Sequence, residues 1–148
     1  MREILPYWLP AVEAVYLRVM DATAPMYVRK RSRTGCGLFA SRDIAAREFI
    51  VEYTGNRMPT TEADSLKTRY LFDLENGWTI DGSPMTNKAR WINHSCDPNC
   101  ECELEDNHII IYAARDIKAG EELSFDYGQD YFDDFIAPVG CKCAGCVE

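Results

Sequence analysis

The most informative stretch of this sequence is RWINHSCDPNC, residues 90–100. Asn93 and His94 place an amide beside an imidazole, and this pair of groups is suited to hydrogen bonding with the edge of a heterocycle. The Asp-Pro-Asn run at residues 97–99 is equally typical of a surface turn. On its own, the stretch therefore fits either a ligand site or a plain turn.

Four further motifs lie on either side of it. They are GCG at residues 35–37, EYTG at 52–55, RYLFDL at 69–74 and GEELSFDYG at 120–128. A Gly-x-Gly run lets a ligand come close to the backbone without a side-chain clash. In the last motif Leu123, Phe125 and Tyr127 alternate along one face of a strand, which ordinary core packing would also explain.

Apolar periodicity and turn residues predict a mainly β chain with short helices and with its chemistry carried on loops. Strands are expected at residues 27–31, 38–41, 49–53, 69–74, 78–81, 109–114 and 123–127. A helix is expected at residues 9–20, and a second helical turn at 87–92. A short helix is also expected at 61–66, where Thr61 stands three residues before Asp64 as in a capping box.

The chain has 148 residues, of which 47% are hydrophobic and 27% charged, as in a single soluble globular domain. No stretch approaches the ~20 continuous apolar residues of a membrane span. The apolar start is interrupted by Glu3, Glu13 and two prolines, so we do not expect a secretory signal. The expected location is cytoplasmic or nuclear, without a membrane partner.

Charge is unevenly distributed along the chain. Residues 101–148 carry 3 Lys/Arg against 12 Asp/Glu, a net charge of −9, while the whole chain has −8. An acidic surface repels phosphates and attracts basic peptides, although acidic residues can also serve solubility alone. Basic residues cluster only at 29–31 and at Arg33. We therefore expect a basic protein as partner and no direct nucleic acid contact.

Seven cysteines cannot all pair within one chain. Three of them, Cys141, Cys143 and Cys146, fall within six residues, a crowding that suits one metal ion better than a disulfide framework. This usage also favours a reducing compartment.

Taken in order, the motifs resemble those of the SET-domain family of protein lysine methyltransferases over residues 26–148. GCG 35–37 matches the first SET motif, YTG 53–55 the second, RWINHSC 90–96 the third and ELSFDY 122–127 the fourth, and the tail resembles the post-SET segment. The resemblance implies a β-clip-like fold of small sheets with a knot-like arrangement of the third and fourth motifs. Its expected divisions are an N-terminal helical segment at 1–25, the SET domain at 26–128 and a post-SET-like zinc-binding tail at 129–148.

The resemblance further implies S-adenosyl-L-methionine as methyl donor, S-adenosyl-L-homocysteine as product, and a channel for the target lysine. Tyr127 is the implied catalytic residue at the junction of the two ligands. The implied cofactor-binding residues are Gly35, Cys36, Gly37, Tyr70, Arg90, Asn93, His94 and Tyr127. The implied channel residues are Tyr53, Tyr70, Phe72 and Phe125. An aromatic channel disfavours the lysine ammonium by desolvation, and phenylalanine at 125 implies capacity for two or three methyl groups.

The zinc ligands implied by the family are Cys96, Cys141, Cys143 and Cys146. The tail reads C-x-C-x2-C here, whereas the familiar spacing is C-x-C-x4-C. Cys100 and Cys102 could replace a ligand, and metal-free thiols are the alternative. The implied substrate is a basic protein such as a histone tail, a histone-like chromatin protein or a ribosomal protein. A homodimer contact through residues 1–25 and a non-catalytic binding module also stay open.

Overall fold

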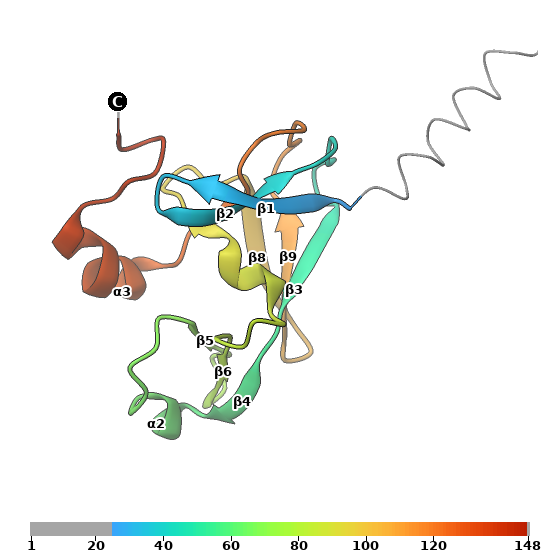
Figure 1. The fold of residues 1–148 in the computed structure, drawn as a ribbon. Coiled ribbons are helices and arrows are strands. Elements are labelled where there is room, and N and C mark those ends of the chain that lie inside the picture. Colours follow the sequence, from blue (N-terminus) through green and yellow to red (C-terminus); the bar gives the residue numbers. More distant parts are fainter. Residues whose placement is uncertain (1–24, 148) are drawn as a thin grey trace, which may run out of the picture.

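The computed structural model describes residues 25–147, so the helix expected at residues 9–20 lies outside the described residues. Figure 1 shows several small sheets gathered around a common centre, in place of one large sheet. This agrees with the mainly β fold class that the sequence predicts. Within the described range, no helix combines the length and the hydrophobicity that crossing a membrane requires.

Three antiparallel sheets make up most of the fold: the hairpin β1–β2, the sheet β3-β9-β8 and the sheet β4-β6-β5. Two- and three-stranded sheets are marginal alone and need a shared core for stability. Their strands are β1 (Tyr27–Ser32), β2 (Gly35–Ala40), β3 (Phe49–Tyr53), β4 (Asn56–Pro59), β5 (Leu71–Asp73), β6 (Trp78–Asp81), β8 (Cys100–Glu105) and β9 (His108–Ala113).

A short parallel pair joins two segments that are far apart in the sequence. Strand β7 (Asn93–His94) lies beside β10 (Ser124–Phe125), with Asn93 opposite Ser124 and His94 opposite Phe125. The pairing continues for one more residue, because the Ser95 backbone N–H donates to the Phe125 carbonyl at 3.2 Å. The third and fourth sequence motifs are therefore neighbours in space.

The helical elements are short. They are α2 (Thr60–Ala63), η1 (Lys88–Trp91), α3 (Gln129–Tyr131), η2 (Phe132–Ile136) and η3 (Ala137–Val139). The element η1 confirms the helical turn expected at 87–92. The expected capping box is wrong, because the residue before α2 is Pro59 and no side chain caps the helix. The Thr60 hydroxyl forms a hydrogen bond with the Thr79 hydroxyl, with 3.0 Å between the oxygens.

The expected strands at 49–53 and 78–81 have the observed bounds, whereas β4, β7 and β8 were not predicted. Strand β8 reads CECELE and lacks the apolar run from which the other strands are predicted. The glutamates of β8 lie on the solvent side of the sheet and alternate with two cysteines and a leucine. The strand therefore contains few of the β-branched and aromatic residues that are typical of strands.

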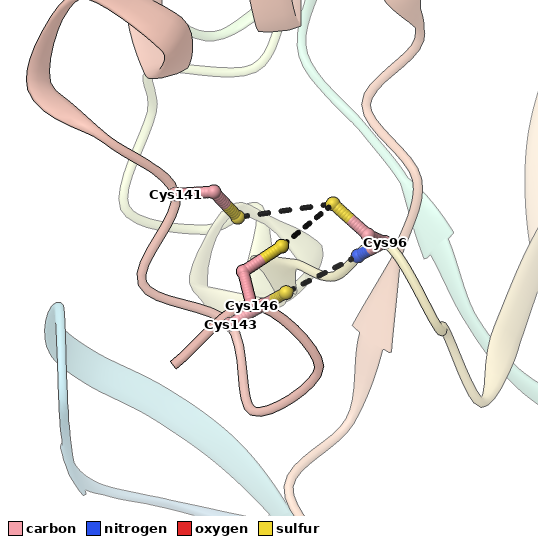
Figure 2. A group of neighbouring side chains, drawn as sticks. All are labelled: Cys96, Cys141, Cys143 and Cys146. Atoms are coloured by element: carbon pink, nitrogen blue, oxygen red, sulfur yellow. Dashed lines mark hydrogen bonds between the residues drawn. The ribbon is translucent and has the colours of Figure 1, made fainter. Parts of the chain in front are cut away.

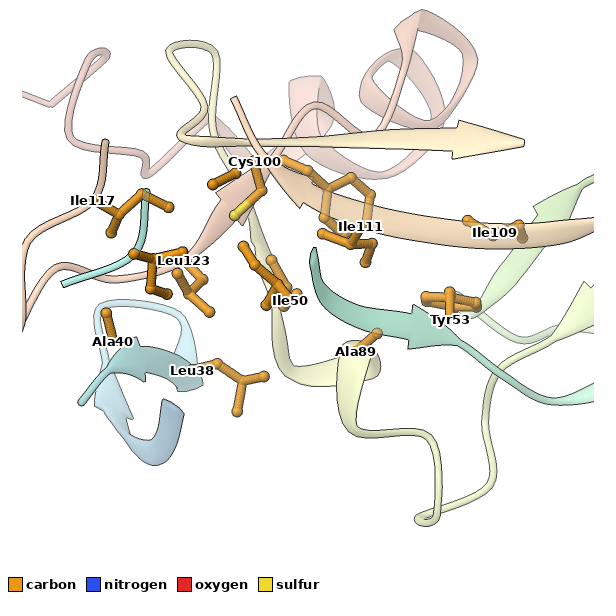
Figure 3. Close-up of a cluster of buried hydrophobic side chains, with 14 of the residues drawn as sticks. Leu38, Ala40, Ile50, Tyr53, Ala89, Cys100, Ile109, Ile111, Ile117 and Leu123 are labelled. Carbon is orange, nitrogen blue, oxygen red and sulfur yellow. The ribbon is translucent and has the colours of Figure 1, made fainter. Parts of the chain in front are cut away.

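The core is built from side chains that the small sheets share (Figure 3). Five large apolar side chains from different elements are at most 4% exposed: Leu38 of β2, Ile50 of β3, Ile109 and Ile111 of β9, and Leu123 before β10. Full burial of each such side chain contributes ~1.5–3 kcal/mol. Because each sheet supplies only a few of them, folding of one sheet depends on the presence of the others.

Asn87 is the polar residue that ties this core to the second motif. It is 0% exposed, its Oδ1 accepts from the Thr54 backbone N–H at 3.2 Å, and its Nδ2 donates to the Gly82 carbonyl at 3.0 Å. Both backbone groups would lose their partner if this amide were removed. The side chain therefore holds the end of β3 against the segment that leads into η1.

We predict that Asn87→Ala lowers the free energy of unfolding by about 2–4 kcal/mol, because each unpaired buried group costs ~1–3 kcal/mol. Urea denaturation followed by tryptophan fluorescence measures the change. Asn56→Ala is the control, since this exposed asparagine lies on β4 and is expected to change stability by less than about 0.5 kcal/mol. Equal stability of the two variants would contradict this role of Asn87.

Candidate functional site

The Asn93 amide is held by the first motif and by the fourth. Its Nδ2 lies 2.9 Å from the Cys36 carbonyl, 2.8 Å from Glu122 Oε1 and 3.1 Å from Ser32 Oγ. A carbonyl and a carboxylate can only accept, so they fix the NH2 end of the amide inward. The amide therefore keeps its carbonyl oxygen Oδ1 as the atom that can accept a hydrogen bond from a ligand.

Gly37 is required where β2 passes Glu122. A Cβ at this position would lie 2.3 Å from Glu122 Oε1 and 3.1 Å from Ser32 Cβ. The absent side chain lets the Glu122 carboxylate reach Asn93 across the hairpin. The Gly-x-Gly motif thus has a packing reason here, in addition to any backbone contact with a ligand.

His94 is oriented by its neighbours on two sides. Its side chain is 7% exposed, Nδ1 accepts from the Tyr127 backbone N–H at 3.2 Å, and Nε2 lies 3.4 Å from Cys96 Sγ. Burial lowers the pKa of His94, while the Asp126 carboxylate, 3.7 Å from Nδ1, opposes that shift. A neutral ring that accepts at Nδ1 carries its proton on Nε2, which faces the cysteine sulfur.

Tyr127 stands at the centre of an aromatic cluster. Its ring centroid lies 4.8 Å from Phe125, 5.5 Å from His94 and 4.8 Å from Tyr131. Its hydroxyl donates to the Ile92 carbonyl at 2.5 Å. Burial among these rings raises the pKa of Tyr127 well above its ordinary value, so the phenol keeps its proton at neutral pH.

The expected channel residues join the same cluster. Phe72 packs 5.4 Å from Tyr53 and 6.5 Å from Phe125, measured between ring centroids. The Tyr53 hydroxyl donates to the Tyr70 carbonyl at 2.9 Å, and burial raises the pKa of Tyr53. Residues from β3, β5 and β10 thus form one continuous aromatic wall.

Three aromatic residues of the tail, Tyr131, Phe132 and Phe135, were not predicted as site residues. Tyr131 packs on Tyr127, Phe132 lies 5.6 Å from the His94 ring, and Phe135 lies 4.8 Å from Tyr131. The i, i+4 spacing of Tyr131 and Phe135 is the sequence signal that could have indicated a helical aromatic face. These residues bring α3 and η2 against the centre of the site.

Arg90 packs against a second expected cofactor residue, Tyr70. Its guanidinium stacks 4.3 Å from the Tyr70 ring centroid and 5.0 Å from that of Trp91, and it donates to the Ser83 carbonyl. The structure brings Asn93, His94, Tyr127 and the Gly35–Gly37 segment together, but it pairs Arg90 with Tyr70 instead. Both residues border the site through packing contacts.

A polar groove of about 400 Å³ opens beside Asn93 and His94. Its walls come from the turn at residues 32–34, the third motif, the fourth motif at 121–124, Arg115 and tail residues 142–145. Ligand sites commonly have ~300–1,000 Å³. The groove is therefore large enough for a small organic molecule, and the tail forms one of its sides.

Four cysteine sulfurs converge where the tail meets the third motif (Figure 2). The Sγ atoms of Cys96, Cys141, Cys143 and Cys146 all lie within 4.8 Å of one another. Cys96 Sγ is 3.8 Å from Cys141 Sγ and 3.6 Å from Cys146 Sγ. Thiolates bound to one tetrahedral zinc at ~2.3 Å would be about 3.8 Å apart, so the cluster has the dimensions of a zinc site.

The shortened tail spacing closes around this cluster by a turn, in which the backbone N–H groups of Cys146 and Val147 both donate to the Cys143 carbonyl at 3.1 Å. Burial alone would raise the pKa of the Cys143 thiol, but hydrogen bonds from the Cys96 backbone N–H and the neighbouring thiols lower it to about 6. Hydrogen bonding with Cys146 raises the pKa of Cys96 to about 12. One thiolate thus forms readily, and the remaining thiols are its nearest partners.

The other three cysteines lie outside the cluster. Cys100 is 1% exposed in the core, Cys102 is half-buried on β8, and Cys36 is exposed on β2. Burial raises the pKa of both Cys100 and Cys102 to about 12, and neither sulfur belongs to the group of four that lie within 4.8 Å of one another. Neither thiol therefore replaces a member of the four-sulfur cluster.

Comparison with known proteins agrees with this arrangement. The chain is 36% identical over 124 residues to the histone-lysine N-methyltransferase trithorax of Drosophila virilis, an alignment that covers 76% of this chain and 3% of that protein. It is 38% identical over 120 residues to the H3 lysine-4 specific histone-lysine N-methyltransferase of Saccharomyces cerevisiae, which covers 72% of this chain and 11% of that protein. The chain thus spans a small part of the length of these relatives. Because the family model of the SET domain also matches residues 35–128, which are more than half of the chain, this protein belongs to the SET-domain family.

Proposed function

We propose that this protein is a protein-lysine N-methyltransferase that uses S-adenosyl-L-methionine and acts on a basic protein such as a histone tail. The observation that carries the proposal is the parallel pairing of β7 with β10. It brings Asn93, His94 and Tyr127 together between a polar groove and an aromatic cluster. The polar groove would bind the polar cofactor, and the aromatic cluster would contact the apolar part of the lysine side chain.

The residues of the groove fit the cofactor. Its free acceptor at Asn93 Oδ1 suits an ammonium group, while the His94 ring, which also lines the groove, suits the face of a base. Lys142 and Arg33 line the same groove and suit a carboxylate. When bound, S-adenosyl-L-methionine would supply the electrophilic methyl group.

The aromatic cluster would prepare the lysine. A lysine amine has a pKa of ~10.4, so only about one in a thousand is neutral near pH 7.4. Placing it among Tyr53, Phe72 and Phe125 removes water from the ammonium and lowers its pKa. The Tyr127 hydroxyl already donates to the Ile92 carbonyl, so its oxygen lone pairs remain available to orient an incoming amine. Tyr127 therefore acts in this proposal by alignment and not as the proton acceptor.

The substrate class rests on charge and on the relatives. Both relatives named above are histone-lysine N-methyltransferases, and one is specific for H3 lysine-4. Asp130, Asp133 and Asp134 are exposed on the tail helices that pack on Tyr127 and His94 through their aromatic neighbours. These carboxylates would attract a lysine flanked by basic residues. A role at chromatin in the nucleus follows from such a substrate.

The four-cysteine cluster would hold Zn²⁺ through Cys96, Cys141, Cys143 and Cys146. The ion would join the tail to the loop after β7, and thereby keep tail residues 142–145 on the wall of the groove. It would act as a structural ion with four protein ligands and no open position for a substrate. The His94 Nε2 proton faces Cys96 Sγ and suits a hydrogen bond to a metal-bound thiolate.

We predict that Tyr127→Phe lowers kcat for methyl transfer to a histone H3 peptide by at least about 100-fold, the cost typical of removing one positioned catalytic hydroxyl or amide. The dissociation constant for the cofactor, measured by calorimetry, is expected to change by less than about threefold. Tyr112→Phe is the matched control, because that phenol donates to Glu105 on an outer strand. If Tyr127→Phe kept full turnover, the proposed role of the phenol would be wrong.

We predict one zinc ion per chain when the purified protein is analysed by atomic emission. Cys143→Ser is expected to lose the ion and to lower cofactor affinity at least tenfold, because the tail wall of the groove is no longer held. Cys102→Ser, which lies outside the cluster, should keep both properties. Retention of zinc by Cys143→Ser would show that the cluster is not the metal site.

We predict that the native protein forms di- or trimethyl-lysine and that Phe125→Tyr forms mainly monomethyl-lysine. The added hydroxyl would occupy space beside Phe72 and Tyr127, whose ring centroids lie 6.5 and 4.8 Å from Phe125. Mass spectrometry of a peptide after prolonged reaction measures the product distribution. Monomethyl-lysine as the sole product of the native protein would refute this prediction.

A further inference from the structure

The β1–β2 hairpin carries a concentration of positive charge, of which the proposed function uses only Arg33. Residues 27–40 contain Arg29, Lys30, Arg31 and Arg33 and no Asp or Glu, in a chain of net charge −8. All four side chains are exposed, and three of them lie on β1, whose second edge pairs with no strand of the described chain. We call these four residues the basic hairpin; it is drawn in blue in Figure 1.

The charges of the basic hairpin are not neutralised by carboxylates. Elsewhere in residues 25–147 the cations Arg47, Arg115 and Lys118 form ion pairs with Asp or Glu. No ion pair within 4.0 Å forms at any of the four hairpin cations among the described residues. An exposed group of uncompensated cations is the electrostatic signature of a surface for a polyanion.

Two of these cations rest on aromatic rings. The Arg29 guanidinium lies 4.8 Å from the centroid of Trp91, whose ring also has Arg90 at 5.0 Å. The Lys30 ammonium lies 5.8 Å from the Phe39 centroid. Such stacking limits the freedom of a long side chain while it leaves the N–H donors available. The hairpin therefore presents its positive charge in a partly ordered arrangement.

We propose that the basic hairpin binds the phosphate backbone of nucleic acid. A strand rises ~3.3–3.4 Å per residue, so the side chains of Arg29 and Arg31 leave the same face of β1 about 7 Å apart. One DNA strand carries a phosphate every ~3.4 Å along its axis, so two cations about 7 Å apart match every second phosphate. The carboxylates of a folded acidic protein have no such regular repeat.

The net charge of the chain does not prevent this contact. The expectation of no nucleic acid contact rested on the −9 of residues 101–148 and on the lack of basic clusters other than residues 29–31 and Arg33. At physiological ionic strength, charges more than ~8 Å apart are largely screened. A local surface of charge +4 can therefore bind phosphates although the molecule is acidic. This binding would be independent of methyl transfer, since the hairpin residues Arg29, Lys30 and Arg31 line neither the groove nor the aromatic cluster.

The test is a fluorescence anisotropy titration of a labelled 20-base-pair DNA duplex with the full chain at 50–200 mM NaCl. Four phosphate contacts predict a slope of about −3 to −4 for log K against log salt concentration, at ~0.9 per contact. Lys30→Glu/Arg31→Glu is expected to weaken binding at least tenfold at 50 mM NaCl and to reduce the slope by about 2. Arg29 and Arg33 stay unchanged, because one stacks on Trp91 and the other lines the groove.

Lys67→Glu/Lys118→Glu is the control, because it changes the net charge by the same amount at two exposed positions outside the hairpin. It should bind DNA within about threefold of the native affinity, and thermal melting checks that both double variants are folded. Methyl transfer to a short free peptide should be equal in the native protein and in Lys30→Glu/Arg31→Glu. Equal loss of DNA binding in both double variants would overturn the proposal, as would competition by poly-glutamate at the same charge concentration as DNA.

Discussion

The parallel pairing of β7 with β10 is the constraint on which the candidate site depends. It consists of two residues on each strand, and a ladder this short contributes little stability alone. The buried side chain of Asn99 reinforces it, because its Nδ2 donates to the Glu122 carbonyl at 2.8 Å and its Oδ1 accepts from the Ser124 backbone N–H at 2.9 Å. One amide thereby satisfies the backbone on the approach to β10 and fixes its register beside β7.

This pairing explains why binding groups and packing groups lie so close together. Asn93 and His94 extend from β7, and Phe125 and Tyr127 follow on the neighbouring chain. The Glu122 carboxylate then reaches back across Gly37 to Asn93. The first, third and fourth motifs therefore form one hydrogen-bonded unit, although up to 92 residues separate them in the sequence.

The tail completes the site by two different kinds of attachment. The aromatic face of α3 and η2 packs on Tyr127 and His94, and the cysteines beyond η3 meet Cys96. Apolar packing alone would leave these short helices free to separate, since few of their side chains are buried. A metal-thiolate link at the far end would restrict that motion. The charges divide in a similar way, with carboxylates on the tail helices and cations on the β1–β2 hairpin.

The sequence by itself determined the mainly β class, the bounds of β3 and β6, the turn at η1 and the crowding of Cys141, Cys143 and Cys146, whereas Cys96 was implied by the family resemblance. These features depend on local turn chemistry, on short-range apolar patterns and on distinctive residue types, all of which a sequence displays directly. It missed β4 and the glutamate-rich β8, whose residues become strands only because neighbouring chains pair with them. It also missed Tyr131, Phe132 and Phe135. Only the tertiary structure decided that Arg90 stacks on Tyr70 and that Cys100 belongs to the core. Such contacts join residues distant along the chain, and their formation depends on the close packing of the whole molecule, which no local pattern encodes.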